Sequence, residues 1–457
     1  MGVRVPLSAE ILLARAAARL SRLAGTGGGT TVPGKLLWKL DPGAVDRLAA
    51  RLPEGTALVS ATNGKTTTAA MAARILAPSL RLAHNRSGAN LVSGVASALL
   101  ASPDAELGLF EVDEAALPEV SRRLRPRALC LGNLFRDQLD RYGELELVAQ
   151  RWRATVSALP EGAALVVNGD DPQVGDLSRE RPATVFGLDD PRHAAAELQH
   201  AADSKWCVRC GTPYVYAAAY IGHLGDYHCE ACGHARPPLD VVARSVELNG
   251  LESVSFELVT PEGGRRVELS VPGLYNVYNA LAASSLARAV GVGLDAIVAG
   301  LQGFSAAFGR FERIALRDRT LLVLLIKNPA GANEVVRTLV AAGSPRLLLI
   351  ALNDEIADGR DVSWIWDVDF EPLLAGLERL VATGERAAEL ALRFKYAGLP
   401  EAAIDVRPSL EDALDRALEL TPAGSELVAL PTYTAMLALR DLVARRGFAR
   451  PYWEEAA

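Results

Sequence analysis

The sequence predicts an α/β protein with two sheet-containing domains, and three observations carry this prediction. Short apolar runs alternate with helix-like segments over residues 56–185, which is typical of a mostly parallel, doubly wound sheet. One of these runs leads through the small-residue turn TNGKT into an alanine-rich helix. Acidic side chains follow other runs where each strand would end, and open α/β sheets bind their ligands at that edge.

The composition agrees with a globular protein of two or three domains. The chain has 457 residues, of which half are apolar, and a net charge of −7. This acidic balance argues against a nucleic-acid-binding protein. No apolar run reaches the length that a membrane span requires. Residues 11–22 are amphipathic and basic; we expect a solvated helix packed on the body, with contact to an anionic membrane face as the alternative.

Residues 56–76 have the strand, loop and helix order of a phosphate-binding loop. Amides at the start of such a helix point toward an anion, a lysine neutralises the anion, and a hydroxyl can hold Mg²⁺. Lys65 and Thr66 stand at these positions. The general pattern requires a glycine where Val59 stands, so the motif is incomplete. A chance Gly-Lys-Thr before a helix is therefore the alternative interpretation.

Two acidic clusters follow apolar strands further along the chain. They are Glu111, Asp113 and Glu114 after one strand, and Asn168, Asp170 and Asp171 after another. Carboxylates at such a sheet edge can coordinate Mg²⁺ between the phosphates of a nucleotide. Acidic residues also commonly form turns, and each cluster taken alone has that alternative interpretation.

Four of the five cysteines stand in two CxxC pairs within a short stretch; they are Cys207, Cys210, Cys229 and Cys232. This spacing is typical of a zinc site with four thiolate ligands, in which the metal is structural because no coordination position is open. Two disulfides or unliganded thiols are the alternatives, and the absence of a visible secretory leader disfavours stable disulfides. The nearby His223, His228 and His234 are expected to be polar loop residues, and would be metal ligands only if one of the cysteines were not.

The motifs also occur together in a known order. ATNGKTTT, EVDEA, NLFRDQLDRYG, NGDDP, PGLYNVYNALAA and GRFE follow one another as in the Mur ligase family, and the resemblance covers nearly the whole chain. Members of that family form amide bonds with ATP during peptidoglycan assembly. Three further features resemble one branch of it, the ligase-like subunits of lipid II isoglutaminyl synthase. They are the four-cysteine insertion, the segment LNDEIADGRDVSWIWDVDFE, and IKNPAGANE together with PTYTAMLALRDL.

The resemblance implies a Mur ligase-like central P-loop ATPase domain with an inserted four-cysteine zinc ribbon, plus a C-terminal Rossmann-like α/β domain. We expect an N-terminal helical extension over residues 1–50 and the ATPase domain over residues 51–313, with the ribbon at about 205–237. The C-terminal domain, residues 314–457, would bind a glutaminase partner. The runs LLLIALND, RLVATGE, IDVRPS and ELVALPT would be its strands.

In the family, ATP phosphorylates a substrate carboxylate and an amine attacks the acyl phosphate. Matched by motif, the ATP-binding residues are Asn63, Gly64, Lys65, Thr66, Thr67, Asn276, Asn279 and Arg310. Glu111 would act in catalysis by binding Mg²⁺, and Lys327 and Asn328 would line the cleft. Gln138 stands where the family usually has a histidine metal ligand, and AQRWRATV lacks the family's modified lysine, which leaves a second Mg²⁺ site open.

The resemblance implies ammonia as the nucleophile, because KNPAG replaces the Asp/His-bearing loop of the amino-acid-adding members. This chain should not release ammonia itself, since its only other cysteine, Cys130, lies inside an apolar strand. The implied partner is a GatD-like class I glutamine amidotransferase subunit in a heterodimer, with Asp361 of this chain completing the catalytic triad. Asp358 is the alternative triad acid, and a loop of acidic turn residues is a third interpretation.

The implied function is ATP-dependent amidation of the D-glutamate α-carboxylate in the lipid II stem peptide to D-isoglutamine. The enzyme would be cytoplasmic, with a peripheral position at the inner face of the cell membrane left open. One alternative is a stand-alone Mur- or folylpolyglutamate-type amino-acid ligase with its own acceptor pocket. Another is a zinc-ribbon binding module with an unused nucleotide fold, against which the intact Lys65, Thr66 and Glu111 argue.

Overall fold

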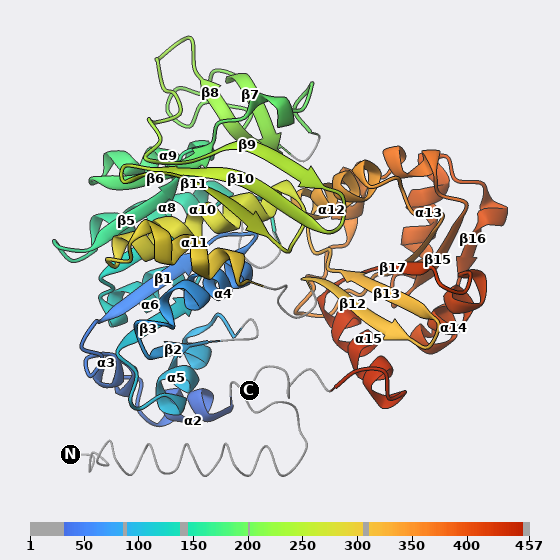
Figure 1. The fold of residues 1–457 in the computed structure, drawn as a ribbon, viewed down its shortest axis with the longest axis horizontal. Coiled ribbons are helices and arrows are strands. Elements are labelled where there is room, and N and C mark those ends of the chain that lie inside the picture. Colours follow the sequence, from blue (N-terminus) through green and yellow to red (C-terminus); the bar gives the residue numbers. More distant parts are fainter. Residues whose placement is uncertain (1–31, 86–88, 138–144, 200–201, 305–309, 451–457) are drawn as a thin grey trace.

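The computed structural model describes residues 32–85, 89–137, 145–199, 202–304 and 310–450. These residues form two β-sheets, each covered by helices on both faces, and a small two-stranded hairpin (Figure 1). Residues 1–31, which include most of the expected N-terminal extension, and Gln138 lie outside the described residues.

Nine strands form the first sheet, in the order β11-β10-β9-β6-β5-β4-β1-β3-β2. Their bounds are β1 Thr56–Ser60, β2 Leu82–His84, β3 Leu107–Glu111, β4 Ala128–Leu131, β5 Ala164–Asn168, β6 Ala183–Leu188, β9 Val241–Asn249, β10 Ser253–Thr260 and β11 Gly263–Leu269. All neighbours from β2 to β9 pair in parallel, whereas β9, β10 and β11 pair antiparallel. The carboxyl ends of β4, β1 and β3 therefore lie side by side.

Helices cover both faces of this sheet because successive strand residues point to opposite faces. Ala57 and Val59 face one core with α4, α10 and α11, and Leu58 between them faces a second core with α2, α3, α5, α6 and α8. The helix bounds are α2 Val32–Leu40, α3 Ala44–Ala49, α4 Lys65–Leu76, α5 Val92–Ala101, α6 Leu117–Leu124, α8 Leu145–Ser157, α9 Pro172–Gly175, α10 Leu274–Ala289 and α11 Leu294–Gln302.

The hairpin of β7 (Val215–Ile221) and β8 (Leu224–His228) lies between β6 and β9 in the chain. One CxxC pair precedes β7, and the other begins directly after β8. The hairpin stands beside the antiparallel end of the first sheet (Figure 1).

The second sheet has six strands in the order β12-β13-β17-β14-β15-β16, parallel except for β12 against β13. Helices α12 and α13 pack on one face, and α14 and α15 pack on the other. The bounds are β12 Arg310–Leu316, β13 Arg319–Leu324, α12 Pro329–Ala341, β14 Leu347–Ala351, β15 Arg379–Thr383, α13 Ala387–Ala397, β16 Ile404–Val406, α14 Leu410–Leu420, β17 Glu426–Pro431 and α15 Tyr433–Arg445.

The predicted α/β class and the alternation over residues 56–185 are confirmed. The antiparallel extension by β10 and β11 was not predicted. The boundary expected at residue 314 stays a prediction; β12 begins before it at Arg310, whose side chain is outside the described part of the chain. Among the described helices, none combines the length and the apolar character needed to cross a bilayer.

Candidate active site and metal centre

The phosphate loop joins β1 to α4 and requires a glycine just before the helix. Gly64 has a φ of 85°, in the left-handed region that favours glycine. An added Cβ there would also lie 2.0 Å from the side-chain oxygen of Asn279. Both the backbone conformation and the available space therefore select glycine. Thr66 and Thr67 follow in the first turn of α4, half-buried and buried respectively.

Asn133, which follows β4, fixes the position of Asn63 in this loop. The Asn133 side-chain oxygen accepts a hydrogen bond from the Asn63 amide at 2.9 Å, and its side-chain nitrogen donates to the Asn63 carbonyl at 3.1 Å. The Thr62 amide also donates to the Asn133 carbonyl at 2.8 Å. The sequence prediction missed Asn133. The feature that could have identified this residue is its place after β4, a strand that pairs with β1.

Lys65 is a buried positive charge at the start of α4. Its ammonium donates to the carbonyl oxygens of Ala61 and Thr62 and to a carboxylate oxygen of Glu114 at 2.7 Å. Burial alone would lower the pKa of Lys65, but the nearby carboxylates of Glu114, Asp113 and Asp137 together outweigh burial and leave the pKa raised. Lysine and helix amides together therefore provide positive potential where a phosphate would bind.

Helix α10 brings two asparagines to the loop. The Asn279 side-chain oxygen accepts from the Thr68 hydroxyl at 3.3 Å, and the Asn279 side-chain nitrogen donates to the Asn276 side chain at 3.1 Å. Asn276 in turn donates to the Pro272 carbonyl at 2.7 Å. Asn276 thus orients Asn279, and Asn279 reaches α4 through Thr68, a residue that the sequence prediction also missed.

Glu111 ends β3 next to the phosphate loop and is only 1% exposed. The parallel register places Glu111 opposite Val59 of β1. Asn85 fixes the Glu111 backbone by accepting from its amide at 2.9 Å and donating to its carbonyl at 2.8 Å. Asp113 and Glu114 are also buried. Buried carboxylates beside a phosphate loop have the ligand chemistry that Mg²⁺ prefers.

The second acidic cluster serves the fold. Asp171 caps α9 by accepting two backbone amides, at 2.9 and 3.2 Å. Asp170 accepts from the Tyr278 hydroxyl at 2.6 Å. Burial raises the pKa of Asp170 to about 6, although the positive charge of Arg236 opposes the shift. Both carboxylates therefore form hydrogen bonds that stabilise the fold.

The C-terminal domain contacts the phosphate loop through the turn before α12. The Asn328 side chain caps α12 and donates to the Asn63 side-chain oxygen at 2.9 Å. The Lys327 ammonium donates to the Thr62 carbonyl at 3.0 Å and to Asp137 at 2.6 Å. The two residues expected at the cleft thus meet the loop directly.

The four cysteine sulfurs form one cluster in which all lie within 4.8 Å of one another. Sulfur–sulfur distances are 3.5 Å for Cys207–Cys232 and 3.4 Å for Cys210–Cys229, and no described cysteine forms a disulfide. Tetrahedral zinc–thiolate bonds of about 2.3 Å place sulfurs about 3.8 Å apart. The cluster therefore fits a zinc ion with four thiolate ligands.

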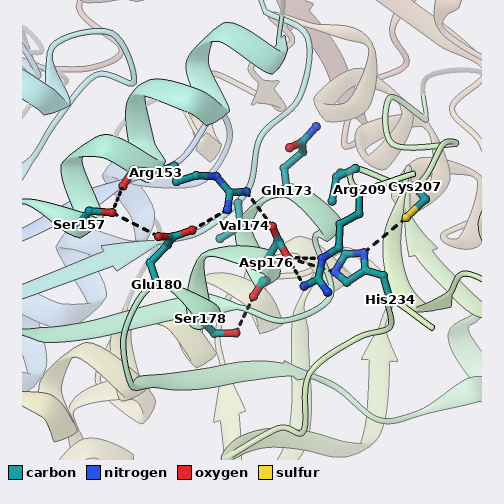
Figure 2. A network of polar contacts seen from close by, with 12 residues as sticks. Arg153, Ser157, Gln173, Val174, Asp176, Ser178, Glu180, Cys207, Arg209 and His234 are labelled. Carbon is teal, nitrogen blue, oxygen red and sulfur yellow. Dashed lines mark hydrogen bonds and ion pairs between the residues drawn. The ribbon is translucent and has the colours of Figure 1, made fainter. Parts of the chain in front are cut away.

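Asp176 links this cluster to α8, a helix that packs on the first sheet (Figure 2). Arg209, between two of the cysteines, forms an ion pair with Asp176, and Arg153 of α8 donates to Asp176 at 2.7 Å. His234 lies 3.4 Å from Asp176 through Nε2, and its Nδ1 lies 3.9 Å from a cysteine sulfur. His223 and His234 lie in loops as expected but are buried, whereas His228 is the last residue of β8.

Asp358 and Asp361 have opposite environments. Asp358 is 4% exposed and accepts from the Thr434 amide at 2.8 Å and from its hydroxyl. Burial raises the pKa of Asp358, although the Thr434 hydrogen bonds oppose the shift. Asp361 is exposed, and hydrogen bonds from Ser363 lower its pKa. Asp361 is thus an ionised surface carboxylate, whereas Asp358 is committed to packing at the start of α15.

The two sheets, the phosphate loop and the buried carboxylates define a protein of the Mur ligase type. A family model described as the Mur ligase middle domain matches residues 59–227, and one described as MurT ligase C-terminal matches residues 325–436. The chain is 34% identical to the lipid II isoglutaminyl synthase (glutamine-hydrolyzing) subunit MurT of Streptococcus pneumoniae, over 94% of this chain and 95% of that protein. The chain therefore belongs to the MurT branch of the Mur ligase family.

Two further comparisons agree. The protein with the same subunit name from Staphylococcus aureus strain N315 is 31% identical over 95% of this chain and 97% of that one. Among solved structures, a pseudomurein peptide ligase type C from Methanothermus fervidus shares the fold, with a TM-score of 0.70 at 21% identity, covering 88% of this chain and 80% of that chain.

Replacing Gly64 tests the crowding at the phosphate loop. Gly64→Ala should lose about 2 kcal/mol more stability than Gly250→Ala, measured by denaturant unfolding. Both glycines have positive φ, so both substitutions strain the backbone, but an added Cβ at Gly250 meets nothing within 4 Å. Asn279, held by Asn276 and Thr68, has little room to yield. Equal losses in the two variants would contradict the crowding.

Proposed function

We propose that this chain is the ATP-dependent ligase subunit of a glutamine-hydrolysing lipid II isoglutaminyl synthase. The observation that carries the proposal is the match over 94% of this chain and 95% of the Streptococcus pneumoniae protein that bears this name. The reaction would convert the α-carboxylate of D-glutamate in the lipid II stem peptide to the amide of D-isoglutamine. The lipid-linked substrate would meet the enzyme at the inner surface of the membrane.

The chemistry would proceed in two steps. A carboxylate oxygen attacks the γ-phosphorus of ATP, which forms an acyl phosphate and releases ADP. Ammonia then attacks the acyl carbon, phosphate leaves with the bonding electron pair, and the nitrogen loses a proton. The first step is needed because an ionised carboxylate is a poor electrophile, whereas the acyl phosphate has a good leaving group.

Residues from two separate segments of the ATPase domain would serve ATP. They are Asn63, Gly64, Lys65, Thr66, Thr67, Asn276 and Asn279, with Arg310 as a further candidate. The buried charge of Lys65 beside the α4 amides would stabilise the phosphoryl group during transfer. Glu111 would hold Mg²⁺, which supplies further neutralisation of phosphate charge.

The cysteines support an external source of ammonia. Cys130 is fully buried, and burial raises its pKa well above the usual range, so it cannot serve as a thiolate nucleophile. The other four cysteines lie in the cluster that we propose binds a metal ion. Glutamine hydrolysis therefore belongs to a second subunit, which we propose to be a GatD-like class I glutamine amidotransferase.

We place this partner on the C-terminal domain, residues 314–457, around Asp361. Trp366, which follows Asp361 closely in the chain, is 48% exposed, and its ring centroid lies 5.9 Å from that of Tyr396, which is 74% exposed. Arg393 joins their two segments by donating to the Ile365 carbonyl at 3.1 Å. Exposed aromatic side chains on a rigid support are common anchors of protein interfaces. Asp361 would orient the histidine of the partner's active site.

We propose that the cysteine cluster binds structural zinc. The purified chain should contain about one zinc per molecule by elemental analysis. Cys207→Ser should lower the zinc content and reduce the melting temperature by about 5 °C or more, because metal binding and folding are coupled. Cys130→Ala is the matched control, since it removes a cysteine outside the cluster and should leave the zinc content unchanged. A zinc-free, folded wild-type chain would refute the proposal.

Lys65→Ala should abolish ATP-dependent amidation of lipid II by at least about 100-fold, even when ammonium replaces glutamine. Activation of the carboxylate precedes amine attack, so an alternative ammonia source cannot rescue it. Lys35→Ala, which removes an exposed lysine on α2, should keep full activity. Retained activity of Lys65→Ala would place the ATP site elsewhere.

A wild-type enzyme that joins an amino acid rather than ammonia would favour the stand-alone ligase.

Asp361→Asn should separate the two activities of the complex. Glutamine-driven amidation should fall by at least about 100-fold, because the partner's histidine loses the carboxylate that stabilises its charged form. Amidation from high ammonium should remain, since that route needs only the ATP site. Asp358→Asn should instead lower stability by about 1 kcal/mol through weaker bonds to Thr434. If Asp358→Asn gave the separation, the triad acid would lie at that position.

A further inference from the structure

The turn of the β7–β8 hairpin carries a histidine that the metal cluster does not need. His223 is 0% exposed. Four thiolates complete a tetrahedral zinc site without an imidazole. A polar side chain buried in a turn therefore requires another explanation.

Both nitrogens of the His223 ring have partners. The Asp203 amide donates to Nδ1 at 3.3 Å, which makes Nδ1 the acceptor and places the ring proton on Nε2. Nε2 lies 3.4 Å from Oδ2 of Asp171, and the same oxygen accepts from the Leu134 amide at 2.8 Å. The imidazole also packs on Phe135, with ring centroids 4.5 Å apart. His223 therefore supports residues 133–137 by a hydrogen-bonded link and by a ring contact.

Residues 133–137 support the phosphate loop in turn. The Phe135 amide donates to the Thr62 hydroxyl at 3.0 Å, and Asn133 holds the Asn63 backbone. Asp137 binds Lys327 at 2.6 Å. A displacement of this segment would therefore be passed directly to the loop and to its contact with the C-terminal domain, because buried groups in a packed core move together.

The same hairpin also contacts the C-terminal domain. Arg337 of α12 donates to the Tyr220 carbonyl at 2.7 Å, one residue before the end of β7. The Gly222 amide in the turn donates to the Gln199 side chain at 3.1 Å. The hairpin turn thus lies between the support of the phosphate loop and the domain that carries Asn328.

We propose that His223 is a positioning residue for the nucleotide site: it fixes residues 133–137 and thereby the geometry with which the phosphate loop binds Mg·ATP. The inference rests on the proposed ATP-dependent function. It gives the four-cysteine ribbon a second role, because the ribbon presents a rigid turn to the ATP site. Loss of the imidazole would remove a buried hydrogen-bond partner from Asp171 and from the Asp203 amide. The surrounding residues would then shift to reduce the cost of the lost hydrogen bonds.

The test uses the full-length chain and calorimetric titration with Mg²⁺ and a non-hydrolysable ATP analogue. His223→Leu keeps the side-chain volume and the contact with Phe135 but removes both hydrogen bonds, and should raise the Kd about tenfold. His223→Gln retains a donor toward Asp171 and should restore most of the affinity. Should His223→Leu fail to fold, His223→Asn, which is too short to reach Asp171, replaces it with the same expectation.

Asp176→Asn is the matched control, because it loosens the opposite end of the ribbon (Figure 2). It should lower the melting temperature at least as much as His223→Leu while changing the Kd less than twofold. An unchanged Kd in His223→Leu would overturn the proposal, as would equal weakening by Asp176→Asn. A wild-type chain that binds no nucleotide would overturn the proposed function instead, and that outcome is seen before any substitution is made.

Discussion

The candidate site depends on the reciprocal hydrogen bonds between the Asn133 side chain and the Asn63 backbone. They attach the loop after β1 to the end of β4, so the pairing of two parallel strands determines where Lys65 lies. The Asn279 side chain then requires a glycine at the start of α4, and Asn328 reaches the Asn63 side chain from the C-terminal domain. Three distant parts of the chain therefore meet at this loop, two of them at Asn63 and the third at Gly64.

Burial gives this site its electrostatic character. Lys65 stays charged because Glu114, 2.7 Å away, acts together with Asp113 and Asp137 against burial, which alone would favour the neutral amine. Lys327 has a matching partner in Asp137. A phosphoryl group brings negative charge to a region that already holds carboxylates, and a divalent cation would offset the excess. The same carboxylates that retain the lysine charge therefore favour a magnesium-dependent nucleotide site.

Neighbouring residues of one motif can have unrelated roles, and the sequence does not distinguish them. Asp358 and Asp361 stand in the same acidic segment, yet Thr434, 76 residues away, buries the first while the second stays exposed. His223 resembles a loop residue in sequence but lies beneath residues 133–137. Spacing and periodicity report local preferences, whereas the burial of one side chain depends on the distant segment that packs over it.

The sequence by itself determined the α/β alternation, the Gly-Lys-Thr turn between a strand and a helix, and the two CxxC pairs, because each is a pattern within a few tens of residues. The tertiary structure alone decided which strands are neighbours. It thereby brought together Asn63 and Asn133, which are 70 residues apart, Thr68 and Asn279, 211 apart, and Asn63 and Asn328, 265 apart. Such pairs follow from the order and register of whole sheets. That order and register arise because each sheet packs a core on both of its faces, and no local sequence pattern encodes them.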